Sequence, residues 1–256
     1  MLADLTAGAL ADAQRRRETV SFADVEKLAL TQKPALDAFA ALAPADRVKI
    51  IAEVKRASPS RGTMATIADP AALASTYAAG GASAISVLTE ERKFLGSLDD
   101  LRSARAAVSI PLLRKDFIAE EYQVFEARAA GADLVLLIVA ALEQPLMQQL
   151  FDLSTELGMT VLVETHSGDE LERAIDLGAT LIGVNARNLS TFELDRELFS
   201  RLSDRFPAGT IRVAESAVRT AADVAHYRSA GADVVLVGEA LVTSDPLLTL
   251  ASFLEI

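Results

Sequence analysis

Residues 231–241 read GADVVLVGEAL, a Gly-Ala pair and an acid followed by an apolar run that ends at Gly238 and Glu239. A Gly-Ala pair before an apolar run occurs three more times, at residues 81, 131 and 178. Gly tolerates the left-handed conformation that ends many helices, and an uninterrupted apolar run is typical of a strand buried on both faces. Each copy therefore indicates the passage from a helix into a buried strand.

Four further apolar runs lie before or between these copies, at residues 49–54, 110–114, 159–163 and 211–214. Helical spacing of apolar residues separates successive strands, as in residues 120–130, 146–157 and 169–177. Eight strands that alternate with helices predict parallel pairing and an α/β fold, the (β/α)8 TIM barrel, for which about 250 residues are typical. The main alternative, an open doubly wound sheet, needs a glycine-rich dinucleotide turn after the first strand. KRASPSRG stands there instead, at residues 55–62.

The chain is expected to form one domain. Residues 49–256 would make the barrel, and residues 1–48 an N-terminal helical extension with helical patterns at 5–17 and 22–30 and the run DAFAAL. A barrel does not require such an extension. We expect it to cap the barrel or to cover the functional site.

Composition excludes several classes of function. The net charge of −11 argues against binding nucleic acid or an anionic membrane surface. The absence of Cys removes disulfides, thiolate nucleophiles and zinc-thiolate sites, and two His leave few ligands for a metal. The first 17 residues have an acid before their basic residues, the wrong order for a secretory signal, and no apolar run approaches the roughly 20 residues that span a bilayer. These features predict a cytoplasmic protein.

Charged residues at the strand ends are candidates for the active site, because catalytic residues of such barrels lie at the carboxyl ends of the strands. Glu53 and Lys55 stand two apart on the first strand and therefore point to the same side. A surface ion pair is the alternative interpretation. Burying a charge inside a barrel costs roughly several kcal/mol for each ion. Because packing gives no return for this cost, a functional role is favoured.

Lys115 and Glu164 end two further strands, in LLRKDF and VLVETH. A lysine near another cation such as Lys55, or in an apolar setting, loses its proton more easily and can act as an acid or as a Schiff-base nucleophile. A carboxylate opposite it completes an acid and base pair. His166 and His226 are not expected to be catalytic.

Residues after the last three strands are expected to bind substrate. GVNARNL supplies Asn185 and Arg187, and AESA supplies Glu215 and Ser216. Barrels bind phosphate in the loops after strands seven and eight, where Ser216 offers a hydroxyl and Gly238 allows close approach of the backbone. A phosphorylated small molecule is therefore the predicted substrate.

From about residue 34 to the C-terminus the chain resembles the indole-3-glycerol phosphate synthase family. The resemblance is carried by IAEVKRASPSRG, LTE, LLRKDF, VLVETH, GVNARNL, AESA and VGEAL, in this order. It implies a lyase that closes the ring of 1-(2-carboxyphenylamino)-1-deoxyribulose 5-phosphate with decarboxylation and dehydration. It implies no cofactor and no metal. In that family the N-terminal extension packs over the active-site end, and other enzymes of the tryptophan pathway are candidate partners.

The resemblance also implies roles for single residues. Lys115 matches the general acid, Glu164 a carboxylate of the dehydration, and Lys55 a substrate-binding residue that shares the acid role. Glu53, Asn185 and Glu215 match residues that orient the intermediate. The substrate contacts implied are Ser58, Phe117, Arg187 (at the substrate carboxylate), Ser216, Ala217, Gly238 and Glu239. Ala217 replaces a usual Gly and Ala186 a common Asn, and Ala217 would not adopt a positive φ cheaply.

Two alternative functions stay open at this point. An aldolase or lyase of the same barrel class would use Lys115 or Lys55 as a Schiff-base nucleophile. A non-catalytic module would bind a phosphorylated ligand or a partner enzyme without turnover.

Overall fold

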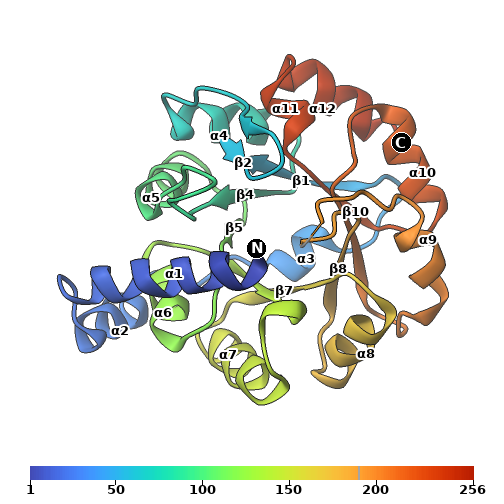
Figure 1. Ribbon diagram of the computed structural model, residues 1–256. Helices are drawn as coiled ribbons and strands as arrows, with labels where there is room; N and C mark the ends of the chain where they lie inside the picture. Colours follow the sequence, from blue (N-terminus) through green and yellow to red (C-terminus); the bar gives the residue numbers. More distant parts are fainter. Residues whose placement is uncertain (190) are drawn as a thin grey trace.

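The computed structural model describes residues 1–189 and 191–256 and confirms the barrel. Eight parallel strands close in the order β1-β10-β9-β8-β7-β6-β5-β4, with helices around them (Figure 1). The strands are β1 (Lys49–Val54), β4 (Ala84–Leu88), β5 (Leu112–Lys115), β6 (Leu134–Ile138), β7 (Thr160–Thr165), β8 (Leu181–Asn185), β9 (Ile211–Glu215) and β10 (Val234–Val237). β7, β8 and β9 thus extend to include the polar residues that the sequence places at their ends.

Helices follow the strands around the barrel. They are α4 (Pro70–Ala79), α5 (Leu98–Ala107), α6 (Glu121–Ala129), η1 (Val139–Ala141), α7 (Gln144–Glu156), α8 (Gly168–Asp176), α9 (Leu198–Leu202), η2 (Ser203–Arg205), α10 (Ala221–Ser229), α11 (Glu239–Val242) and α12 (Pro246–Leu254). The loop after β1 adds a small antiparallel hairpin, β2 (Ala57–Ser58) with β3 (Gly62–Thr63), which the sequence did not predict. Among the described residues, no helix combines the length and apolar character needed to cross a membrane.

The repeated Gly-Ala pairs end helices as predicted. The glycines at 81, 131, 178 and 231 all have φ between 81° and 94°. After α6, Gly131 N–H donates to the carbonyl of Arg128 and Ala132 N–H to that of Ala127. This pair of bonds satisfies carbonyls that the helix end would otherwise leave open. The chain then turns directly into the next strand.

Alternation along each strand divides the apolar core in two. On β8, Leu181 belongs to the cluster that fills the barrel, whereas Ile182 and Val184 belong to the cluster between strands and helices. Gly183 and Asn185 therefore share the inward direction of Leu181. The same alternation brings the polar side chains at the strand ends into the mouth of the barrel.

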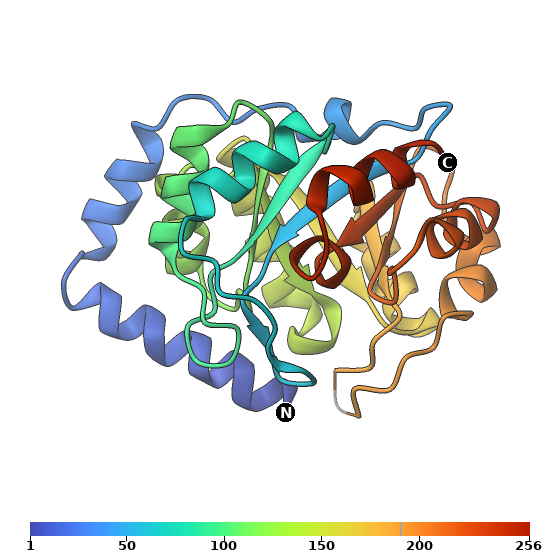
Figure 2. The same cartoon turned by 90° about the horizontal axis from the view of Figure 1, so that it is seen from above.

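The N-terminal extension reaches both ends of the barrel. It consists of α1 (Leu2–Arg17), α2 (Phe22–Leu30) and α3 (Ala38–Leu42). Leu36 N–H, just before α3, donates to Asp133 at the start of β6, so α3 lies at the amino-terminal end of the strands. Figure 2 shows α1 at the opposite edge, together with the β2–β3 hairpin. Leu5 of α1 packs into the barrel-filling cluster from that side.

Candidate active site

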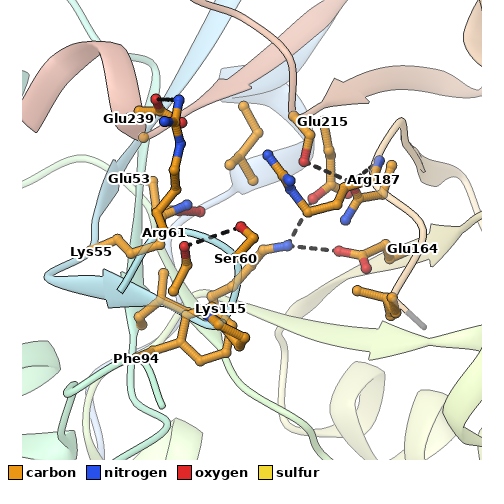
Figure 3. Close-up of a pocket in the computed structure, with 18 of the residues that line it drawn as sticks. Glu53, Lys55, Ser60, Arg61, Phe94, Lys115, Glu164, Arg187, Glu215 and Glu239 are labelled. Atoms are coloured by element: carbon orange, nitrogen blue, oxygen red, sulfur yellow. Dashed lines mark hydrogen bonds and ion pairs between the residues drawn. The ribbon is translucent and has the colours of Figure 1, made fainter. Parts of the chain in front are cut away.

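A pocket opens at the carboxyl ends of the strands and gathers every residue that the sequence assigned to the site. The residues that line it include Glu53, Lys55, Ser58, Lys115, Phe117, Glu164, Asn185, Arg187, Glu215, Ser216, Ala217, Gly238 and Glu239. Figure 3 labels seven of these, Glu53, Lys55, Lys115, Glu164, Arg187, Glu215 and Glu239. These residues come from the ends of β1, β5, β7, β8, β9 and β10 and from the loops that follow. The predicted convergence is confirmed, whereas the roles of the single residues stay predictions.

Lys115 occupies the centre of the polar side of the pocket. Its Nζ donates to Glu164 Oε2 at 2.7 Å and to Glu215 Oε2 at 2.8 Å (Figure 3). Burial alone would lower the pKa of Lys115, but the carboxylates of Glu164 and Glu215, with Glu53 farther away, raise it. The expectation that Lys115 loses its proton easily is therefore wrong, because its nearest charges are anions and not Lys55.

The two carboxylates beside Lys115 are not equivalent. Burial would raise the pKa of Glu164, but Lys115 and His166 hold it well below its usual range. Burial, together with the Glu164 carboxylate, raises the pKa of Glu215 to about 8 against the pull of Lys115. Like charges that share one cation cannot both ionise easily, so one of the two keeps a proton.

Glu53 and Lys55 form an ion pair inside the pocket rather than at the surface. The Glu53 side chain is 4% exposed and that of Lys55 is 19% exposed, so the ammonium is the more accessible partner. A Cβ at Gly238 would lie 2.7 Å from Glu53 Oε1 and 3.1 Å from Lys55 Nζ. Gly238 thus makes room for this pair.

A turn after β9 joins Asn185 to the predicted phosphate-binding residues. Ser216 Oγ donates to Asn185 Oδ1 at 2.7 Å, and the same oxygen accepts the N–H of Arg187 at 3.0 Å. Ser216 and Ala217 have φ of 70° and 59°. Ala217 therefore does adopt the left-handed conformation that is costly for a residue with a Cβ.

Positive charge gathers beside the turn. Arg61 pairs with Glu239, and Arg219 Nη2 lies 3.7 Å from Glu239 Oε1. Burial lowers the pKa of Arg187, Glu239 opposes this shift, and Arg61 and Arg219 add to it. An anionic ligand at this side would meet several guanidinium groups at once.

Comparison with known proteins identifies the family. A family model described as "Indole-3-glycerol phosphate synthase" matches residues 2–251. The chain belongs to the indole-3-glycerol phosphate synthase family. A protein of this name from Leifsonia xyli is 72% identical over 99% of this chain and 97% of its own length. Indole-3-glycerol phosphate synthase from Mycolicibacterium gilvum is 58% identical over 96% of this chain and 90% of its own length.

Solved structures of other proteins share the fold. Thiamine phosphate pyrophosphorylase from Pyrococcus furiosus superposes with a TM-score of 0.61 at 13% identity, over 80% of this chain and 93% of that one. N-acetylmannosamine-6-phosphate 2-epimerase from Clostridium perfringens also gives 0.61, at 14% identity, over 76% and 88%. At such low identity the likeness concerns the barrel alone.

Four residues of the pocket lining were not predicted from the sequence. Leu5, Phe94, Arg61 and Arg219 all line the pocket, and the Phe94 and Phe117 rings lie 6.1 Å apart. Arg61 stands within the quoted segment IAEVKRASPSRG, and the excess of polar residues there was a usable signal. Leu5 gave none, because an apolar helix residue is indistinguishable from core until α1 is placed.

Arg114 and His166 lie outside the pocket lining, whereas Asp116, next to Lys115 in the chain, is part of it. Arg114 is fully buried and pairs with Asp116 at 2.9 Å, on the other side of β5 from Lys115. His166 lies outside the pocket lining but contacts Glu164, which the sequence did not predict. Within the described residues, no group of three or more His, Asp or Glu is arranged to hold a metal ion.

Proposed function

We propose that this pocket carries out the family's reaction with Lys115 as its general acid. The family's activity is the formation of indole-3-glycerol phosphate, by ring closure of 1-(2-carboxyphenylamino)-1-deoxyribulose 5-phosphate with decarboxylation and dehydration, a lyase reaction of tryptophan biosynthesis. The observation that carries the assignment is the ammonium of Lys115, held between Glu164 and Glu215 in the pocket.

Lys115 supplies the proton on which ring closure depends. The ketone carbon of the substrate becomes electrophilic as its oxygen gains a proton, and the aromatic ring carbon can then attack it. The flanking carboxylates keep Lys115 protonated until the ketone oxygen approaches. Loss of carbon dioxide restores the aromatic ring, and loss of the hydroxyl as water needs a further acid and base, for which Lys55 and Glu164 are the proposed groups.

The two ends of the substrate have matching surroundings. The phosphate would bind at the turn of Ser216 and Ala217 and at Gly238, with Glu239 holding Arg61 nearby. The aromatic ring would pack against Phe117 on the apolar wall. Arg187 is assigned to the substrate carboxylate, Ser58 to substrate contact, and Glu53, Asn185 and Glu215 to orientation of the intermediate.

The alternative Schiff-base chemistry is disfavoured by the same contacts. An amine must lose its proton before it can attack a carbonyl carbon. Two carboxylates within 2.8 Å of Lys115 Nζ stabilise the protonated form. Borohydride added during turnover should therefore leave no covalent adduct on Lys115 or Lys55, and a trapped adduct would favour the aldolase.

The assignment of Lys115 is tested by replacing it. We expect Lys115→Met to lower kcat by about 10² to 10⁴, the range of a general acid, while substrate binding changes much less. The fluorescence of indole-3-glycerol phosphate measures turnover, and calorimetry measures binding. Lys27→Met, at an exposed position on α2, is the matched control. An unchanged kcat would remove Lys115 from this role.

We further propose that the chain forms a single domain that works in the cytoplasm. The substrate is a phosphorylated small molecule, and the net charge of −11 argues against nucleic acid or an anionic membrane as partners. Other enzymes of the tryptophan pathway are candidate partners, and co-sedimentation of the purified enzymes would test this.

A further inference from the structure

His166 stands directly behind the Glu164 carboxylate. It follows β7, and its side chain is 8% exposed. His166 Nε2 lies 3.2 Å from Glu164 Oε1, and His166 Nδ1 lies 3.1 Å from Glu170 Oε2 on α8. The backbone N–H of His166 also donates to Glu170 Oε2 at 2.7 Å, which fixes Glu170 in this position.

The two nearby carboxylates favour a positive charge on the imidazole ring. A neutral imidazole has one N–H and can satisfy only one carboxylate, whereas an imidazolium can donate to two. His166 Nδ1 shares a hydrogen bond with Glu170 Oε2 at 3.1 Å, whereas Nε2 lies 3.2 Å from Glu164 Oε1 as an ion pair without hydrogen-bond geometry. Burial alone would lower the pKa of His166, but Glu164 and Glu170 outweigh it and raise the pKa to about 10.

Glu164 is consequently held between two cations. Its Oε2 accepts from Lys115 and its Oε1 faces His166, so each oxygen has its own positive partner. Glu215 has Lys115 at Oε2, while its buried Oε1 has no hydrogen-bond partner among the described residues. The neighbouring position on that side is Gly183, whose missing Cβ leaves the space that Oε1 occupies.

We propose that His166 is a positioning residue, which holds Glu164 ionised and aimed at Lys115, so that Glu215 is the carboxyl that keeps the exchangeable proton at neutral pH. This proposal rests on the proposed function for the roles of Lys115 and Glu164. A proton placed on Glu164 would weaken its contacts with both cations. A proton on Glu215 Oε1 weakens none of the contacts described.

Charged residues from five elements surround His166 and the two carboxylates beside Lys115, and each of them affects where the protons lie. Glu164 and His166 come from β7, Glu170 from α8, Lys115 from β5 and Glu215 from β9. Glu53 on β1 acts on Lys115 from a longer distance. On the far side of His166 a second cavity is lined by Glu193 and by the ion pair of Asp195 with Arg201.

The charge of His166 can be measured without substrate. The chain has two His, so ¹⁵N spectra of protein labelled at its imidazole rings contain two sets of signals, and the His226→Gln variant assigns them. We expect His166 to stay doubly protonated at pH 8, and to lose its proton at lower pH in Glu170→Gln. A neutral His166 ring at pH 7 in the unmodified protein would overturn the proposal, whatever the activity of the enzyme.

The pH profile of kcat/KM tests the consequence for Glu215. Activity should fall above about pH 8, because ionised Glu215 adds negative charge to a pocket that binds an anionic substrate. Glu215→Gln should abolish this step. His166→Asn should move it upward by about one pH unit or more, because the carboxylate pair loses a nearby positive charge and keeps its proton longer.

A control variant and two distinct negative outcomes complete the test. His226→Gln, on the exposed face of α10, should leave the profile unchanged. If His166→Asn lowers kcat but does not move the step, His166 has only a structural role and the proposal fails. If the unmodified chain forms no indole-3-glycerol phosphate, the proposed function fails, and the ¹⁵N spectra still decide the charge of His166.

Discussion

Two neighbouring residues at the mouth of β9 adopt a conformation that suits neither. Ser216 and Ala217 both have positive φ, where an L-residue costs about 1 to 2 kcal/mol relative to ordinary backbone. Both line the pocket, and strain of this kind persists where the surroundings or a ligand require it. The turn therefore stores strain at the place where the phosphate is proposed to bind.

Replacing Ala217 by Gly should release part of this strain. We expect Ala217→Gly to raise the free energy of unfolding by about 0.5 to 1 kcal/mol, because the gain exceeds the extra entropy of Gly in the unfolded chain. Urea denaturation measures the change. Ala221→Gly, at the start of α10, should have the opposite sign. A loss of stability in Ala217→Gly would show that the turn is not strained.

Gly183 on β8 makes room for the Glu215 carboxylate. A Cβ at this position would lie 2.1 Å from Glu215 Oε1 and 3.4 Å from Leu162 Cδ1. Glu215 is 1% exposed, so its carboxylate has little space into which to move. We expect Gly183→Ala to displace Glu215 from Lys115.

The predicted effect is on turnover. Displacement of a group by about 1 Å can cost about 10² in rate, and kcat of Gly183→Ala should fall by about 10- to 100-fold. Steady-state kinetics measure the effect. Combined with Glu215→Gln, the loss should be less than additive, since both changes act on one group. Full additivity would place the effect of Gly183 elsewhere.

These steric roles could not be predicted from the sequence, although the residues around them could. Lys115 and Glu164 were found because each ends an apolar run. The pKa of Lys115 was predicted in the wrong direction, since the identity of its nearest charges depends on which strands adjoin. Nothing in the local sequence distinguishes Gly183 from any other strand residue, because the Glu215 side chain that needs its space is far away in the sequence.

Among the elements, the four Gly-Ala copies each end a helix with a glycine of positive φ, but the surroundings of these glycines differ. Gly131 and Gly178 both have positive φ, at 90° and 81°. A Cβ at Gly131 would lie 2.7 Å from Arg105 Cγ, whereas one at Gly178 would meet nothing within 4 Å. Arg105 in turn pairs with Asp133 at 2.6 Å, the acid of the same copy.

The two glycines make a matched pair for mutation. Gly178→Ala should cost about 1 to 2 kcal/mol in the free energy of unfolding, the cost of a left-handed residue alone. Gly131→Ala should cost more, because it also pushes Arg105 away from Asp133. Thermal or urea denaturation compares them. Equal losses in the two variants would mean that the Arg105 contact adds nothing.

The helices and strands were largely predictable, because apolar runs and helical spacing of apolar residues are local features of the sequence. The end of α7 shows the limit of that approach. Gly158 has φ of 77° and Met159 N–H donates to the Ser154 carbonyl, so the same helix end occurs without a Gly-Ala pair. The β2–β3 hairpin was missed for a similar reason, since two-residue strands carry no periodicity.

At the scale of the whole molecule, ion pairs fasten the N-terminal extension to the barrel behind the site. Arg16 of α1 contacts both carboxylate oxygens of Glu126 on α6, at 2.6 and 2.8 Å. Glu126 also lies 3.5 Å from Arg114, the β5 residue that precedes Lys115. Detaching α1 would leave the buried Glu126 carboxylate with less positive charge, which costs stability. The extension and the barrel should therefore unfold together.

Tryptophan probes can test this coupling, because the chain contains no Trp. Phe22→Trp would report on α2, where the Phe22 ring lies 5.3 Å from that of Phe125 on α6. Phe206→Trp would report on the barrel beside Phe199, at 6.1 Å. We expect the two fluorescence signals to change at the same urea concentration, as in a cooperative single domain. An earlier transition at Phe22→Trp, seen also by circular dichroism in the unmodified chain, would show that the extension is a separate folding unit held to a barrel that is stable without it.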